Sequence, residues 1–242
     1  MTFKKPFLYW LESSFWDVVD LVFPPVCPGC QEIGQRWCEE CQNAVARMPA
    51  EVCEICGEPT VAMVCKRCTA SRPSLTHIRS WSVFKPPIRN ALHTLKYRNN
   101  VALGHSLAKS IAPGLRDFNW PVQVILPIPL SELCYRERGY NQAALIARPL
   151  AQLTGLDYQT RALRRARHTR SQVGLSIEER KQNLKKAFQV DAKLVAGKEI
   201  LLVDDVCTTG ATLIEAAATL AEAGAKSIYA YTVARAVSHH DA

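Results

Sequence analysis

Two adjacent carboxylates near the C-terminus have the spacing of a ligand-binding site. Asp204 and Asp205 follow the apolar run Ile-Leu-Leu-Val (200–203) and precede Cys-Thr-Thr-Gly-Ala-Thr (207–212). Neighbouring carboxylates repel each other, and each resists desolvation unless a cation or a hydrogen-bond donor meets it. The pair is therefore expected to face a ligand, a metal ion or water.

The residues after this acidic pair are suited to holding a phosphate group. Thr208, Thr209 and Thr212 offer hydroxyl groups, and Gly210 permits a turn that points backbone N–H groups inward before a predicted helix. Carboxylates also accept hydrogen bonds from vicinal hydroxyl groups such as those of ribose. The segment 204–212, which includes Ala211, is therefore predicted to bind a phosphoribose. A Walker A site is excluded, because no Gly-Lys-Ser/Thr occurs there.

A second candidate site lies in four Cys-x-x-Cys pairs near the N-terminus. One such pair supplies two thiolates to a tetrahedral zinc ion, and a second pair completes the site. Eight thiolates predict two closed, structural zinc sites, and the short loops favour sequential pairing, although cross-braced pairing stays open. The segment has few large apolar residues, so the metal is expected to replace a core. The predicted ligands are Cys27, Cys30, Cys38, Cys41, Cys53, Cys56, Cys65 and Cys68.

Alternating strands and helices are predicted to position the acidic pair. Strands are expected at 78–84, 122–126, near 158 and 163, and at 198–203 and 228–233. Helices are expected at 88–97, 103–111 (halted by Pro113-Gly114), 142–153 (capped by Asn141), 176–186 and 212–223. This order favours an α/β fold with a parallel sheet, in which ligands bind at the carboxyl ends of the strands.

The N-terminal region and the composition set the remaining expectations. An amphipathic helix over residues 6–22 is interrupted by acidic residues, which argues against a signal peptide or a membrane span and for a cytoplasmic protein. The predicted units are this helix (1–25), a double zinc ribbon (26–70) and an α/β domain (78–236). A formal charge of +8 suits a polyanionic or phosphorylated partner and gives weak support.

Several motifs together resemble one protein family. VDDVCTTGAT is similar to the phosphoribosyl pyrophosphate (PRPP) motif of type I phosphoribosyltransferases. With "LVFPPVCPGC", "LKYR", "LPIPLSELCYRERGYNQAALIARPLA" and "RHTRSQVGLSIEERKQNLKKAF", the chain resembles the ComF/GntX family from about Pro24 to Val233. The resemblance implies a type I phosphoribosyltransferase fold with a zinc ribbon. It also implies a bacterial cytoplasmic protein linked to natural competence, DNA uptake and the use of DNA as a nutrient.

The resemblance also implies roles for individual residues. Asp204 and Asp205 would bind the ribose hydroxyl groups, residues 208–212 the 5′-phosphate, and Mg²⁺ would accompany PRPP. Pro127-Ile128-Pro129 stands where such enzymes have a pyrophosphate loop, but its two prolines depart from the Gly or charged residue common there. Arg136, Arg138 and Asn141 would then supply contacts. Within a flap over 164–172, Arg167, His168, Arg170 and Gln172 would close on pyrophosphate, with Arg170 in a catalytic role.

Three functions remain open from the sequence. The first is phosphoribosyl transfer from PRPP to a base, with Cys134, Tyr135 or the Tyr97 region as guesses for selecting the acceptor. Lys96 and Arg98 would contact a ligand or an acidic partner, or lie at an exposed helix end. The second is a PRPP-binding adaptor without turnover, beside a competence helicase. The third is a module for single-stranded DNA, although the usual groove of aromatic and basic residues is missing.

Overall fold

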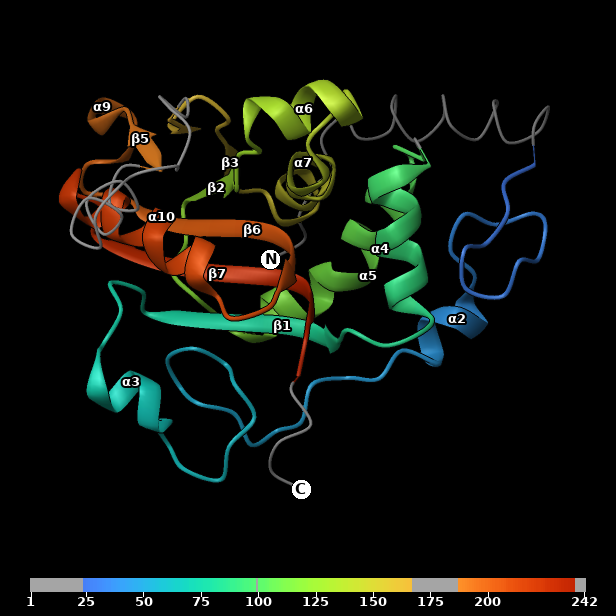
Figure 1. Ribbon diagram of the computed structural model, residues 1–242, viewed down its shortest axis with the longest axis horizontal. Helices are drawn as coiled ribbons and strands as arrows, with labels where there is room; N and C mark the ends of the chain where they lie inside the picture. Colours follow the sequence, from blue (N-terminus) through green and yellow to red (C-terminus); the bar gives the residue numbers. More distant parts are fainter. Residues whose placement is uncertain (1–23, 99, 167–186, 238–242) are drawn as a thin grey trace, which may run out of the picture.

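The computed structural model of the chain describes residues 24–98, 100–166 and 187–237 (Figure 1). The expected helix at 6–22, the expected helix at 176–186 and most of the 164–172 flap lie outside the described residues. None of the described helices is long and apolar enough to cross a membrane.

A five-stranded parallel sheet forms the centre of the molecule. Its spatial order is β1-β7-β6-β2-β3. The strands are β1 (His77–Val83), β7 (Ser227–Arg235), β6 (Glu199–Cys207), β2 (Val124–Pro127) and β3 (Asp157–Tyr158). A separate antiparallel pair joins β4 (Leu163–Arg165) to β5 (Phe188–Val190). The α/β parallel sheet expected from the sequence is confirmed.

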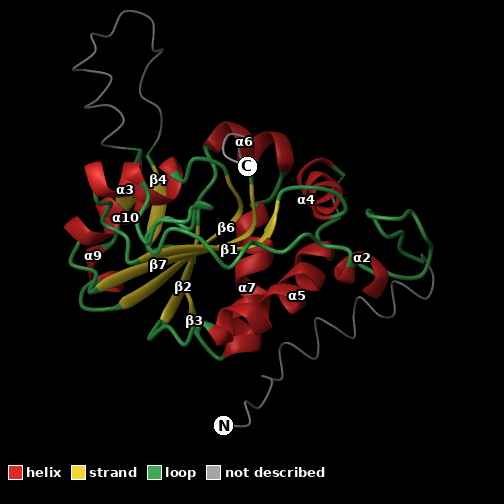
Figure 2. Ribbon diagram, turned by 90° about the horizontal axis from the view of Figure 1, so that it is seen from below, coloured by secondary structure: helices red, strands yellow, loops and turns green. Residues whose placement is uncertain are grey.

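Helices cover both faces of this sheet (Figure 2). One face packs on α4 (Ile88–Tyr97), α5 (Leu103–Asp117) and α7 (Gln142–Thr154), and the other on α10 (Ala211–Glu222). The alternation of strand side chains produces this division, because Leu201 and Val203 belong to the first core and Ile200 and Leu202 to the second. The shorter helices are α2 (Glu39–Asn43), α3 (Lys66–Ala70), α6 (Glu132–Arg138) and α9 (Ala192–Val195).

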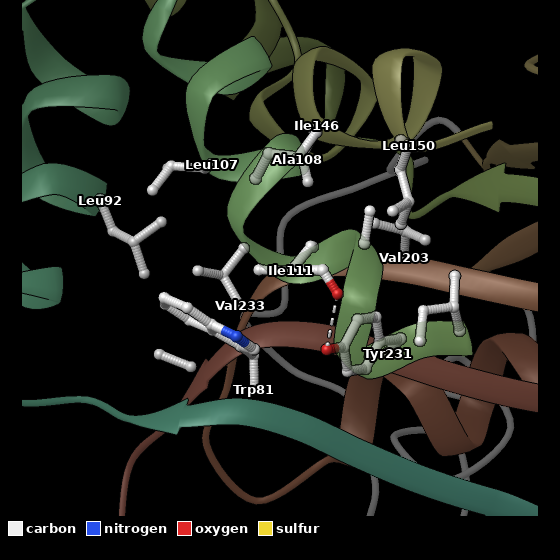
Figure 3. Close-up of a cluster of buried hydrophobic side chains, with 14 of the residues drawn as sticks. Trp81, Leu92, Leu107, Ala108, Ile111, Ile146, Leu150, Val203, Tyr231 and Val233 are labelled. Atoms are coloured by element: carbon white, nitrogen blue, oxygen red, sulfur yellow. Dashed lines mark hydrogen bonds between the residues drawn. The ribbon is translucent and has the colours of Figure 1, made fainter. Parts of the chain in front are cut away.

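The first core ties α5 closely to the sheet. Figure 3 shows Ile111 beside Tyr231, whose hydroxyl group donates to the Ile111 carbonyl at 3.1 Å. A Cβ on Gly114 would lie 2.9 Å from the Tyr231 hydroxyl oxygen, so glycine there permits close approach.

The expectation that Pro113-Gly114 halts this helix was wrong. The helix runs through Pro113 to Asp117 because residues such as Leu115 are buried beyond it.

Other boundaries also differ from the expectations. Strand β6 continues through the acidic pair to Cys207, because Asp204 pairs with Thr232 and Val206 with Ala234 of β7. Five elements among the described residues were not expected from the sequence: α2, α3, α6, β5 and α9. The N-cap at Asn141 is confirmed, since its side chain accepts a hydrogen bond from the Ala143 N–H at 3.0 Å.

The cysteine-rich segment packs against the α/β domain at two places. Figure 1 shows α2 and α3 near opposite ends of β1. Cys27, Trp37 and Cys41 belong to the same buried cluster as α4 and α5, whereas Ile55 and Cys56 belong to the cluster that contains α10. The segment does lack a separate apolar core, and its side chains extend both cores of the α/β domain.

Candidate functional site

The acidic pair lies where the topology of the sheet changes direction, next to the pairing of β6 with β2. From β2 the chain passes through α7 on one face to β3, whereas from β6 it passes through α10 on the other face to β7. In open parallel sheets, ligands bind outside the carboxyl ends of strands where the chain direction diverges in this way. Pro127 at the end of β2 pairs with Val203, one residue before Asp204.

Asp205 is paired with a lysine from α4. Its side chain is buried, and its Oδ2 lies 2.6 Å from Nζ of Lys96. Its Oδ1 also accepts a hydrogen bond from the Val206 N–H at 2.9 Å. An ionised carboxylate can therefore persist at this buried position, because a cation and a backbone donor both meet it. Lys96 was expected to contact a ligand or an acidic partner, or to lie at an exposed helix end. The structure shows it in an internal ion pair.

Asp204 has a different electrostatic environment. Its Oδ1 accepts a hydrogen bond from the Asp205 N–H at 2.9 Å. Burial, followed by the negative charge of Asp205, raises the pKa of Asp204 well above its usual range, although the Lys96 charge partly opposes this shift. The pair thus combines one carboxylate with its own cation and one that would gain from donors supplied by a ligand.

The loop after β6 forms the second part of the site. Gly210 has φ +76°, a left-handed conformation that favours glycine, and it caps α10. Thr208 and Thr209 are exposed, and Thr209 Oγ1 accepts from the Ala211 N–H at 3.3 Å. Outside the loop, Arg67 of α3 donates to the Thr209 carbonyl at 3.0 Å. The predicted order of strand, acidic pair, loop and helix is therefore present, with the helix N-terminus at Ala211.

The proline-containing segment after β2 is bonded to β6 next to the acidic pair. The Ile128 N–H donates to the Val203 carbonyl at 2.9 Å, and Asn141 Nδ2 donates to the Ile128 carbonyl at 2.9 Å. Asn141 therefore fixes this backbone. A cavity of about 1020 Å³ opens from here toward α6, lined by Pro127, Pro129, Leu130, Ser131, Glu132, Leu133, Cys134, Tyr135, Asn141, Ala144, Thr160, Arg165 and Ala166. The acidic pair and the 208–211 loop do not line this cavity.

Of the predicted arginines that the structure describes, Arg138 lies over Tyr97 and Arg136 forms an ion pair. The Arg138 guanidinium carbon is 5.3 Å from the centroid of the Tyr97 ring, and Tyr97 is exposed at the end of α4. Arg136 forms an exposed pair with Glu132 at 2.6 Å. Arg170, predicted to be catalytic, lies outside the described residues with Arg167, His168 and Gln172.

The eight cysteines form two clusters that fit zinc. The sulfur atoms of each cluster lie within 4.8 Å of one another. The separations between Cys27 and Cys38 and between Cys56 and Cys65 are both 3.6 Å. Four sulfurs around zinc at about 2.3 Å would be about 3.8 Å apart, so the geometry agrees. The pairing is sequential: the first cluster is Cys27, Cys30, Cys38 and Cys41, and the second is Cys53, Cys56, Cys65 and Cys68.

Backbone donors favour a thiolate at Cys53 in the second cluster. Burial raises the pKa of the Cys53 thiol, but hydrogen bonds from the N–H groups of Cys65, Cys56 and Ile55 outweigh this effect and lower it to about 6. The Cys65 N–H lies 3.3 Å from the Cys53 sulfur. Because a thiolate is the form that binds zinc, these donors prepare Cys53 for a metal ion.

Sequence reasoning missed the contacts of two residues at this site. Lys96 was expected at a ligand, an acidic partner or an exposed helix end, and Arg67 was not considered. The Lys-Tyr-Arg motif at 96–98 drew attention to the end of α4, but nothing local to Arg67 marks its contact with the loop. Both contacts join residues more than 100 positions apart, Lys96 with Asp205 and Arg67 with Thr209, so only the folded chain reveals them.

Comparisons with known proteins agree with this architecture. Residues 18–70 match the double zinc ribbon domain family, and residues 133–241 match the phosphoribosyl transferase domain family. The DNA utilization protein YhgH of Salmonella typhi is 32% identical over 205 residues, covering 82% of this chain and 89% of its own. Competence protein F of Haemophilus influenzae is 31% identical over 208 residues, covering 82% and 90%.

A competence protein of lower sequence identity extends the same relationship. ComFC of Bacillus subtilis is 27% identical over 216 residues, covering 83% of this chain and 85% of its own. With relatives of this similarity aligned along most of both chains, and with both domain families matched, the chain belongs to the ComF/GntX family.

Proposed function

We propose that this protein binds PRPP between β6 and β2 and transfers its phosphoribosyl group to an acceptor. The observation that carries the proposal is the position of the acidic pair and the 208–211 loop. The pair lies near the carboxyl end of the central strand β6 and the loop follows it, where the chain directions from β6 and β2 diverge. A phosphoribose has a phosphate for the helix N-terminus and vicinal hydroxyl groups for carboxylates, so one ligand satisfies both groups.

The proposed roles follow from the chemistry of each group. Asp204 and Asp205 accept hydrogen bonds from the ribose hydroxyl groups, and residues 208–212 bind the 5′-phosphate. Pro127, Ile128 and Pro129 border the pyrophosphate, with Arg138 near it and Arg170 in a catalytic role. Mg²⁺, bound with PRPP, would neutralise part of the pyrophosphate charge as that group departs. Carboxylate and phosphate oxygens are ligands that suit this ion.

The cellular role is proposed from the names of the relatives. DNA utilization protein and competence protein both refer to the handling of DNA. We propose a cytoplasmic role in competence, DNA uptake or the use of DNA as a nutrient, with a helicase and single-stranded DNA as partners. The alternative is an adaptor that binds PRPP without turnover, and pyrophosphate release would distinguish the two.

Calorimetric titration with PRPP and Mg²⁺ tests the binding site. We expect the wild type to bind, and Asp205→Asn to weaken binding by roughly 1–3 kcal/mol, the range for hydrogen bonds to charged groups. Equal affinity for the wild type and this variant would rule out the acidic pair. Glu222→Gln is the matched control, because it removes a carboxylate from the exposed far end of α10.

A turnover assay then separates the enzyme from the adaptor. The protein would be incubated with PRPP, Mg²⁺ and a panel of nucleobases, and pyrophosphate release would be followed. Release that depends on one base identifies the acceptor and supports transfer. Binding of PRPP without release for any base would leave the adaptor as the function.

A further inference from the structure

The second cysteine cluster and the 208–211 loop share one buried core. Cys53, Ile55 and Cys56 belong to the same cluster of buried side chains as Cys207 and Leu213, which flank the loop. The side of the sheet that bears α10 is therefore completed by the second zinc ribbon, residues 51–70. The 208–211 loop contacts α3 of this ribbon and leads into α10.

Ile78 of β1 connects the two parts physically. Its backbone N–H donates to the Ile55 carbonyl at 2.7 Å. A Cβ placed on Gly210 would lie 3.5 Å from Ile78 Cδ1, so this side chain also contacts the turn of the loop. On the ribbon side, a Cβ on Gly57 would lie 2.4 Å from the Ile78 carbonyl oxygen, which shows how closely the two backbones approach.

Arg67 makes a direct bond between ribbon and loop. It lies on α3, next to the ligand Cys68, and its Nη1 donates to the Thr209 carbonyl at 3.0 Å. The same guanidinium lies beside the sulfur of Cys56, a hydrogen bond that raises the pKa of Arg67. One side chain therefore touches a predicted zinc ligand and the backbone of the loop.

Arg235 anchors the same cluster from the end of β7. This arginine is fully buried, and its Nη1 donates to Glu58 Oε2 at 2.8 Å, while Nη2 donates to the Cys56 carbonyl. Arg235 pairs across the sheet with Cys207, the residue before the loop. The backbone of the second cluster is thus bonded to the end of β7, which pairs with the end of β6 where the loop begins.

The first cluster makes its contacts elsewhere. Gln42 Oε1 accepts from the Ser110 hydroxyl group at 2.6 Å, and the Arg47 guanidinium carbon lies 4.0 Å from the Trp81 ring centroid. These contacts involve α5 and β1. Within the described parts of the chain, these contacts of the first ribbon do not reach the loop. The first cluster is therefore an internal control for the second.

We propose that Arg67 is a positioning residue that holds the 208–211 loop, so that the second cysteine cluster controls the affinity of the loop for a phosphoribose. The consequence for ligand affinity depends on the proposed function, whereas the effect on the loop itself does not. Loss of order at the second cluster would release Arg67 and leave the Thr209 carbonyl without this donor. The loop would then sample conformations that do not bind phosphate.

Amide hydrogen exchange of residues 208–213 in the zinc-loaded, ligand-free protein tests the effect on the loop. We expect Arg67→Ala to speed exchange about 2- to 10-fold, the range conferred by one hydrogen bond, with zinc content unchanged. Lys66→Ala is the control, because it removes the neighbouring exposed positive charge and should leave exchange unchanged. Exchange in Arg67→Ala equal to the wild type would overturn the proposal.

Two further measurements distinguish this proposal from the proposed function. We expect Arg67→Ala to weaken PRPP affinity about 2- to 10-fold, and Lys66→Ala to leave it unchanged. If the wild type does not bind PRPP, the proposed function fails while the exchange result still decides the role of Arg67. Cys65→Ser should speed exchange of the loop and Cys38→Ser should not, and equal effects of the two would contradict specific control by the second cluster.

Discussion

Asp204 and Asp205 are adjacent in sequence but differ in how the fold compensates their charge. Asp205 has Lys96 at 2.6 Å, whereas the pKa of Asp204 is raised by burial and by its neighbour. A carboxylate held ionised in this environment destabilises the ligand-free protein. Its retention is explained if a ligand supplies the missing donors, which is the role proposed for ribose hydroxyl groups.

Asp204→Asn should therefore stabilise the ligand-free protein at neutral pH, by about 0.5–2 kcal/mol. Because the pKa of Asp204 is raised in the folded state, proton binding there stabilises the fold. This stabilisation is complete below the unfolded pKa of about 3.9 and is lost as pH rises through the folded pKa. The stability difference between variant and wild type should accordingly grow as pH rises. Urea unfolding from pH 5 to pH 9 measures this difference.

The matched variant for this prediction is Glu222→Gln, which removes one negative charge from an exposed position. It should change stability little and without the same increase with pH. A gap between Asp204→Asn and wild type that stays constant or shrinks with pH would show that Asp204 is not strained. Asp204→Asn should also lose PRPP affinity, so that its effects on stability and on binding have opposite directions.

The acidic pair, the loop and the cysteine ligands could be predicted from local sequence, because each is a short motif whose chemistry depends on spacing. The partners of these motifs could not. Lys96 reaches Asp205 only because α4 packs on the face toward which Asp205 points, and Arg67 reaches Thr209 only through the docking of the ribbon. Such pairs depend on tertiary packing, which no local pattern encodes.

At the scale of elements, the main errors arose where packing overrode local preference. The α5 helix continues through Pro113, because the turns on either side bury Ile111 and Leu115. The missed helix α6 is short and has no buried residue, so it lacks the apolar periodicity that reveals a helix. Its ends do carry recognisable signals, a Ser131 side-chain cap and Gly139 in a left-handed conformation.

Two helical prolines offer a matched test of this argument. Pro113 is exposed and Pro149 of α7 is buried. Pro113→Ala should restore a helix hydrogen bond and raise stability by about 1–2 kcal/mol, the interior penalty of roughly 3 kcal/mol reduced by the greater entropy of the unfolded chain. Pro149→Ala should gain less or lose stability, because it also removes buried contacts. Equal gains in chemical denaturation would contradict the packing argument.

At the scale of the whole molecule, the zinc ribbons are parts of the two cores. The first cluster extends the core of α4 and α5, and the second extends the core of α10. The sequence indicated a separate small unit, because its cysteines are contiguous and its apolar residues few. It did not indicate docking, because the contacts of Arg235 with Glu58 and Cys56 join opposite ends of the chain.

Metal removal should therefore affect the entire fold. We expect two zinc equivalents per chain, one for each set of four cysteines. Independent ribbons would unfold on chelation and leave the α/β domain intact, so that Cys53→Ser would disrupt mainly the small unit. The structure favours a different result, because disorder at the second cluster would leave the buried Arg235 guanidinium without the Cys56 carbonyl and Glu58. Breaking a buried charge pair costs about 3–5 kcal/mol.

Calorimetry of Cys53→Ser, with zinc analysis of the same sample, decides between these outcomes. We expect about one zinc per chain and a main unfolding transition at lower temperature, because the side of the sheet that bears α10 loses part of its core. Cys38→Ser is the matched variant, since it affects the other core through α4 and α5. A main transition unchanged from wild type, preceded by a small separate one, would show that the ribbons fold independently. In that case the second cluster could not control the 208–211 loop through the fold.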